Sequence, residues 1–279
     1  MSNNINWGKI YESTAWGSGV TDNNISWGKS YADLAGGGLD ADYQAVLDYA
    51  ITQGYTAPSA AQQTLQNQLV VDLKAGGIWS KLDTFAVFAT DGDSDFALID
   101  WKRLSDFTAV NSPTFTTNEG YNSNGTSSYL DTNYNATTDG VNFQNTDACE
   151  GGWVINPISG VLCGTSGGPG DGLNMINTIG QRLNMFATNI NTAANLSGNS
   201  GLRAINRTSA TDVVLFNEAT TINRTTTTAS KIDGSRRVLN GQNNFLNAGS
   251  KCAIYFNGGS LISQQTNLNN SLSTYITSL

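Results

Sequence analysis

The chain has 279 residues, of which 13% are charged and 39% are hydrophobic, with a formal net charge of −8 and no histidine. This length suits one large β domain with an accessory segment, and it allows a sizeable core to be buried. The acidic balance argues against nucleic acid as a partner, because phosphates attract a basic surface. The lack of histidine excludes His-based triads, imidazole metal ligands and imidazole acid–base catalysis.

The N-terminal residues, Met1 to Ile5, do not combine a basic start with an apolar run, so we expect no secretory signal. No window approaches the roughly 18 consecutive apolar residues of a membrane span, so we expect no membrane partner. Because charges are few, Asn, Thr, Ser and Gly must cover the surface. Such a composition is typical of extracellular or virion β proteins.

An internal repeat opens the chain. Residues 4–9 return as residues 24–29, an offset of 20 positions, and Tyr11 is echoed by Tyr31 while Trp16 adds a third aromatic site. Two copies are too few for a solenoid, which needs about three units to bury a shared core. The segment is rich in Gly and Asn and has no helical period, so it predicts an extended arm.

Aromatic side chains are favoured anchors at interfaces, because they give a large contact area for few rotatable bonds. We therefore expect the arm, residues 1–38, to dock onto a partner or a sister subunit, the alternative being that it packs on its own domain. The predicted docking residues are Trp7, Lys9, Tyr11, Trp16, Trp27, Lys29 and Tyr31.

Residues 39–83 predict a helical hairpin. The first helix would be capped by Asp40 and stop at Gly54, and the second would start at Ser59 in a capping box with Gln62. Apolar residues recur at helical spacing in both, at Tyr43, Val46, Leu47, Ala50 and Ile51 and then at Leu65, Leu69 and Leu73. A hairpin of this size is not stable alone, so we expect it to pack on the following domain or on a neighbouring subunit.

Asp91, Asp93 and Asp95 form the densest acidic cluster in the chain. Alternating aspartates can ligate calcium, but the calcium-binding loop needs Gly at its sixth position and Glu at its twelfth. Phe96 and Lys102 occupy those positions. We therefore expect a solvated turn and no cofactor, with calcium as a weak alternative.

The stretch from Phe115 to Tyr134 holds the strongest local turn signal. Two short β-type runs flank Asn124 and Gly125, and both residue types tolerate a positive φ. This pattern predicts strand, turn and strand, paired as a hairpin.

Downstream, short β-type runs come at regular intervals, separated by turns rich in Gly and Asn. Such spacing predicts a sandwich or barrel, and we expect a jelly roll. Apolar positions from Leu268 to Leu279 then predict a terminal helix capped by Ser263. The predicted strands are 85–88, 152–155, 160–164, 173–176, 182–188, 202–206, 213–217, 220–225, 236–240 and 251–257.

Three cysteines, Cys149, Cys163 and Cys252, leave at least one unpaired, so a disulfide framework is not expected. Cys149 and Cys163 flank a predicted hairpin and could pair. The alternative is that all three are small buried hydrophobic residues in a protein folded in a reducing cytoplasm.

A family resemblance rests on the motifs Gly-Tyr, Asn-Gly-Thr and Tyr-Leu-Asp-Thr, which follow one another within residues 120–132. They are preceded by Ile99 to Lys102 and followed by a hydrophobic strand and a short helix. This order resembles the concanavalin A-like (laminin-G-like) jelly-roll domains of tailed-bacteriophage structural proteins, especially those of phages that infect Bacteroidetes. The resemblance covers residues 84–279. It implies a mainly β, antiparallel jelly-roll β-sandwich, preceded here by the arm and the hairpin and followed by a C-terminal helix.

Glycosidases on related scaffolds need paired carboxylates, which in relatives alternate along one strand as Glu-x-Asp-x-Glu. No glutamate of this chain lies in such an alternation; they are Glu12, Glu119, Glu150 and Glu218. We therefore expect no enzymatic activity.

Two functions remain open. The first is a virion structural protein, a capsid decoration, head-fibre or tail component, that is homo-oligomeric and assembled in the host cytoplasm with other virion proteins. The second is a module that binds host-surface or mucus carbohydrates. Its candidate residues are Tyr121, Asn122, Tyr134 and Trp153, although aromatic residues of a sandwich lie more often in the core.

Overall fold

The chain divides into two compact units, Met1–Asp40 and Ala41–Leu279. The second unit contains both the helical hairpin and the β-sandwich. The predicted arm lies outside the described residues up to residue 37. The computed structural model describes residues 38–165, 172–176, 181–184, 190–192, 198–218, 220–225, 230–241 and 244–279, with the backbone alone for the three short segments between 172 and 192.

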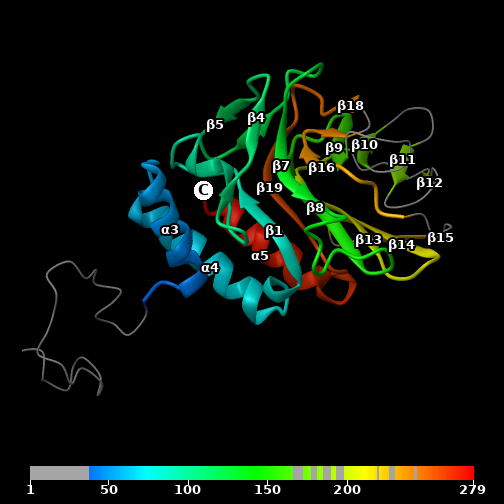
Figure 1. Cartoon of the computed structure of the whole chain (residues 1–279), viewed down its shortest axis with the longest axis horizontal. Coiled ribbons are helices and arrows are strands. Elements are labelled where there is room, and N and C mark those ends of the chain that lie inside the picture. The colour runs from blue at the N-terminus through cyan, green and yellow to red at the C-terminus, as the bar shows by residue number, and fades with distance from the viewer. Residues whose placement is uncertain are drawn as a thin grey trace, which may run out of the picture. The chain divides into compact units, whose positions relative to one another are not determined.

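The first sheet has eight strands in the order β15-β14-β13-β8-β19-β6-β5, and β1 pairs with β19 on the same edge as β6 (Figure 1). Every pairing in it is antiparallel. Its strands are β1 Leu82–Val87, β5 Thr114–Thr116, β6 Gly120–Asn122, β8 Ala148–Ile155, β13 Gly201–Arg207, β14 Asp212–Asn217, β15 Thr220–Thr225 and β19 Lys251–Gly258.

The second sheet has seven antiparallel strands in the order β12-β11-β10-β9-β16-β7-β4. They are β4 Thr108–Val110, β7 Tyr129–Asn135, β9 Gly160–Thr165, β10 Gly172–Ile176, β11 Gln181–Asn184, β12 Ile190–Thr192 and β16 Ser235–Val238. Two small pairs complete the strands, β2 Ile99–Asp100 with β3 Ser105–Asp106 and β17 Asn240–Gly241 with β18 Asn244–Phe245.

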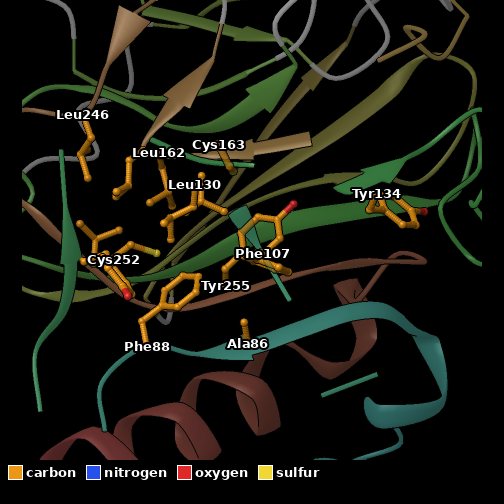
Figure 2. Packing of buried hydrophobic residues seen from close by; sticks show 14 of the residues in the cluster. Ala86, Phe88, Phe107, Leu130, Tyr134, Leu162, Cys163, Leu246, Cys252 and Tyr255 are labelled. Atoms are coloured by element: carbon orange, nitrogen blue, oxygen red, sulfur yellow. The ribbon is translucent and has the colours of Figure 1, made fainter. Parts of the chain in front are cut away.

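The hydrophobic core lies between the two sheets. Successive residues of a strand point to opposite faces, so each strand can contribute every second side chain to this core. Phe88 and Tyr255 enter it from the first sheet, and Leu130 and Cys163 enter it from the second (Figure 2). The predicted antiparallel jelly-roll sandwich, with its preceding hairpin and C-terminal helix, is confirmed.

Three helices cover the outer face of the first sheet: α3 Ala41–Gln53, α4 Ala60–Ala75 and α5 Gln265–Thr277 (Figure 1). The central strands β8, β13 and β19 are buried along almost their whole length, so both of their faces must be covered. Helix α5 contacts β13, and α4 contacts α5. No helix in the described residues has the length and apolar character needed to cross a bilayer.

Gln66 of α4 fixes the hairpin to the rest of the protein. Its side chain is fully buried and donates to the hydroxyls of Thr90 (3.2 Å) and Tyr275 (3.1 Å), while Tyr43 donates to its carbonyl oxygen (2.8 Å). These bonds join α3, α4, α5 and the loop after β1. The hairpin therefore packs on its own sandwich, one of the two alternatives that the sequence left open.

The helix ends differ in detail from the prediction. Ser59 caps α4 by accepting from the backbone N–H of Gln62 (3.3 Å), but Gln62 does not complete the capping box, because its side chain bonds Thr90 and Asn118 instead. Ile51, expected on the apolar face of α3, is 72% exposed. Ser263 does not cap the terminal helix, since it lies in a 3-10 turn, Ile262–Gln264, that precedes α5.

The predicted hairpin around Asn124 and Gly125 is wrong in its pairing. The turn exists, with Gly125 at φ +81° and the Asn124 side chain accepting from three following backbone N–H groups. However, β6 before it belongs to the first sheet and β7 after it belongs to the second. An Asn-Gly turn sets the local chain direction but not the strand partner, so here it carries the chain from one sheet to the other. The hairpin partner of β6 is β5.

Asp100 ties the β2–β3 pair to β1. Its Oδ1 accepts from the backbone N–H groups of Phe85 (3.2 Å) and Lys102 (3.0 Å), and an Arg103 nitrogen lies 3.7 Å from the other carboxylate oxygen. The carboxyl group is fully buried, and this burial raises the pKa of Asp100 to about 6 in spite of those contacts.

A raised pKa in the folded state means that Asp100 stabilises the fold at low pH and that this contribution is lost as the pH rises towards about 6. The loss is on the order of 2–3 kcal/mol. Asp100→Asn cannot ionise, so the excess stability of the wild type over this variant should fall by that amount between about pH 4 and about pH 7, as measured by urea denaturation. A matched control is Asp95→Asn at an exposed carboxylate. A difference between wild type and Asp100→Asn that does not change with pH would contradict the burial argument.

Candidate functional site

The predicted docking residues of the arm lie outside the described residues, so their role stays a prediction. They are Trp7, Lys9, Tyr11, Trp16, Trp27, Lys29 and Tyr31.

The predicted sugar-binding aromatic residues do not form an exposed platform. Tyr121 and Tyr134 are 2% and 1% exposed, and Trp153 is 7% exposed. The Tyr121 hydroxyl donates to the Ser94 carbonyl (2.7 Å), and Tyr121 lies on the first sheet whereas Tyr134 lies on the second. Of the four candidates only Asn122 is partly exposed. This is a correction, and its reason is that Tyr121 and Tyr134 belong to the core between the sheets, while Trp153 is buried on a strand covered on both faces.

Asp91 and Asp93 act as caps for the helical hairpin. Asp91 accepts from the backbone N–H of Ser59 (2.9 Å), and Asp93 accepts from those of Thr56 (2.6 Å) and Phe96 (2.8 Å). Burial opposes ionisation of Asp93, but these backbone bonds outweigh it and hold the pKa of Asp93 below its usual value. Within the described part of the chain no three acidic, Cys or His side chains gather in a way that could hold a metal, and calcium at Asp91, Asp93 and Asp95 stays a weak prediction.

A buried ion pair crosses the core. Glu150 of β8 and Arg236 of β16 are each 1% exposed and join the two sheets, with Arg236 Nε donating to Glu150 Oε1 (3.0 Å) and a second contact between Arg236 Nη2 and Glu150 Oε2. The Tyr255 hydroxyl donates to the same Oε1 (2.7 Å) and accepts from the Asn257 amide (3.1 Å). Burial raises the pKa of Tyr255, and the charge of Glu150 adds to this.

Each member of this glutamate, tyrosine and arginine cluster is at most 1% exposed, so we interpret the cluster as part of the core. From the sequence, Glu150 was identified only as a carboxylate without an alternating acidic partner, and its buried role was not predicted. A signal was present, because Glu150 is the single charged residue in the otherwise apolar run from Ala148 to Ile155. A lone charge in a strand buried on both faces needs an internal partner of opposite sign.

The cysteines are free and buried. Cys149 lies on β8 of the first sheet and Cys163 on β9 of the second, so the hairpin that would have joined them does not exist. Burial raises the pKa of all three thiols, including Cys252, which makes them poor nucleophiles. They behave as the small buried hydrophobic residues of the second alternative.

At strands β7 and β16 the outer face of the second sheet is polar. Along β7 the residues Leu130, Thr132 and Tyr134 are buried, and the residues between them point outward. Tyr129, Asp131, Asn133 and Asn135 therefore face away from the core, as do Ser235 and Arg237 on β16. Unlike the first sheet, this outer face carries none of the helices α3, α4 and α5 (Figure 1).

Arg237 and Tyr129 are stacked on this face. Arg237 is paired in register with Asp131, which places Tyr129 at the diagonal position of the neighbouring strand. The Cζ of Arg237 lies 4.3 Å from the centroid of the Tyr129 ring, a cation–π contact. Gly164 follows Arg237 in the same cross-strand row and contributes no side chain.

No protein-family model matches this chain, and no curated protein matches it. Among solved structures it is similar to Trypanosoma rangeli sialidase in complex with 2-keto-3-deoxy-D-glycero-D-galacto-2,3-difluoro-nononic acid, at 12% identity over 76% of this chain and 39% of that chain, with a TM-score of 0.43. It is also similar to domain 4 of AbnA, a GH43 extracellular arabinanase from Geobacillus stearothermophilus, in complex with arabinotriose, at 11% identity over 68% of this chain and 98% of that chain, with a TM-score of 0.39. The chain spans about two fifths of the length of the sialidase. Structural similarities at this level give no information about the activity of this chain.

Removing one partner of the buried ion pair should destabilise the fold more than removing both. Arg236→Met leaves the Glu150 carboxylate uncompensated in the core, and we expect a loss of about 3–5 kcal/mol in the free energy of unfolding by urea denaturation. The double variant Glu150→Leu/Arg236→Met should lose less than the single variant.

Arg224→Met, at a partly exposed arginine of the edge strand β15, is the matched control and should change the stability by no more than about 0.5 kcal/mol. Additive losses in the double variant would contradict a direct pairing of the two charges.

Proposed function

We propose that this chain is a non-enzymatic structural protein of a virion, attached to the particle by its N-terminal arm and displaying the β-sandwich. A capsid decoration, head-fibre or tail component fits this description. The protein would be assembled with other virion proteins in the host cytoplasm, in several copies. The resemblance of residues 84–279 to jelly-roll domains of tailed-phage structural proteins supports the assignment to a virion.

One observation carries the docking part of the proposal. The three α-helices of the described residues bury most of their apolar side chains within their own subunit, among them Val46 of α3, Leu69 of α4 and Leu272 of α5. The hairpin is thus already engaged and offers no large apolar stripe to a partner. The tryptophans of residues 1–38 remain as the anchors for an interface.

The chemistry of the described residues supports a role without catalysis. The glutamate of the core, Glu150, is paired with Arg236 and closed to solvent. Asp91 and Asp93 accept backbone hydrogen bonds from the hairpin. A glycosidase would need two carboxylates that face the substrate across an open cleft.

The alternative function is carbohydrate binding. With the three aromatic candidates Tyr121, Tyr134 and Trp153 buried, this alternative needs another surface. The outer face of the second sheet favours it, because an aromatic ring and polar side chains lie together there at Tyr129, Asp131 and Arg237.

The docking proposal predicts that the arm tryptophans control incorporation into particles. The full chain with Trp7→Ala, Trp16→Ala and Trp27→Ala should keep the Tm of the wild type but lose at least about tenfold in copies per particle, because each large anchor contributes on the order of 1–2 kcal/mol at an interface. The measurement is quantitative mass spectrometry of particles purified from lysed host cells.

A matched control replaces three asparagines of the same arm by alanine, at Asn4, Asn23 and Asn24. Normal occupancy of the tryptophan variant would contradict the proposal. Light scattering of the two variants separates the possible partners, because an arm that joins sister subunits should leave the tryptophan variant monomeric.

A further inference from the structure

We propose that the outer face of the second sheet binds a carboxylate-bearing sugar, with Arg237 as the anion-binding residue, Tyr129 as its support and Asp131 as an acceptor for sugar hydroxyls. This proposal rests on the carbohydrate-binding alternative described above, and it names the binding residues and the class of sugar. It is independent of the arm and of any attachment to a particle.

The first argument is that two adjacent arginines, Arg236 and Arg237, point to opposite faces of the sheet and have different partners. Arg236 points into the core and is bound to Glu150, whereas Arg237 points outward by strand alternation. Within the described part of the chain the Arg237 side chain forms no ion pair and no hydrogen bond, and its Nε is a buried donor without a partner. A guanidinium has five N–H donors, so this one is left with unused hydrogen-bonding capacity.

The second argument is the position of Asp131. It lies directly opposite Arg237 in register, yet the two side chains form no salt bridge in the described residues. Asp131 Oδ1 instead accepts from the Ser235 hydroxyl and from the backbone N–H of Asn133 (2.9 Å). Stacking on Tyr129 thus holds the guanidinium away from the nearest carboxylate and keeps its donors available.

The third argument is charge complementarity, which restricts the ligand. An arginine fork with free donors binds a planar carboxylate in a bidentate manner. Asp131 beside it and the net charge of −8 would repel a dense polyanion. A sugar with one carboxylate per residue fits both conditions, because its hydroxyls can donate to Asp131 while its carboxylate meets Arg237.

The neighbouring side chains extend the surface. Val110 of β4 pairs with Tyr129 in register, and both are partly exposed. Together they present an apolar strip beside Arg237 and Asp131. The C–H face of a sugar ring can pack on such a strip. Thr108, exposed and opposite Asp131, adds a hydroxyl to the same row.

The test is an NMR chemical-shift titration of the full chain with trigalacturonate, with its neutral counterpart galactotriose and with inorganic phosphate. We expect trigalacturonate to bind at least about tenfold more tightly than galactotriose, since only trigalacturonate offers carboxylates to the Arg237 guanidinium. Phosphate at the same concentration should not displace it.

Arg237→Gln should weaken trigalacturonate binding by at least about tenfold, and Arg224→Gln on β15 is the matched control that should leave it unchanged. Arg237→Lys keeps the charge but lacks the planar fork, so it should also bind more weakly, and it serves as the second variant if the glutamine variant folds poorly.

Four results would each overturn the proposal. They are absence of binding to trigalacturonate, equal binding of galactotriose, displacement of trigalacturonate by phosphate, and unchanged affinity in both Arg237 variants. Because the isolated chain is titrated, such a failure would leave the arm-mediated attachment unaffected.

Discussion

The fold depends on one constraint, which is that the central strands of the first sheet are buried on both faces. All or nearly all residues of β8, β13 and β19 are buried. One face closes on the second sheet, and the other requires a further layer. The helical hairpin and the C-terminal helix form that layer, and Gln66 and Tyr275 connect it internally through hydrogen bonds. The helices are therefore structural parts of the domain.

Because of this constraint, the two sheets differ in how their outer faces are covered. In the second sheet, strands β7 and β16 alternate buried residues with at least partly exposed ones, which is the pattern of a sheet with one solvated face. Its outer face holds the stacked pair of Tyr129 and Arg237, and its inner face receives Arg236 as the partner of Glu150. Surfaces for recognition are thus expected at the second sheet and in the arm, and not on the helices.

Local features of the fold could be predicted from the sequence, whereas pairing and orientation could not. Helical spacing located α3, α4 and α5, and short β-type runs located most strands, because periodicity reports which side of an element is buried. The strand partner after Asn124 and Gly125 was mispredicted, because a turn signal contains no information about the second sheet. The site residues Tyr121, Tyr134 and Trp153 were misplaced for a related reason. Alternation shows that a strand has two faces, but only the register with its neighbours shows which face is inside.

The central claim is that the helices and the sandwich form one cooperative unit around the first sheet. Native-state hydrogen exchange of the full chain tests it most directly, because it measures the opening free energy of each backbone N–H group. We predict that the slowest amides of α4 and α5 share the opening free energy of β8 and β19. Exchange of both helices at markedly lower free energy, with the strands still protected, would show that the helices are a detachable layer and would contradict the account.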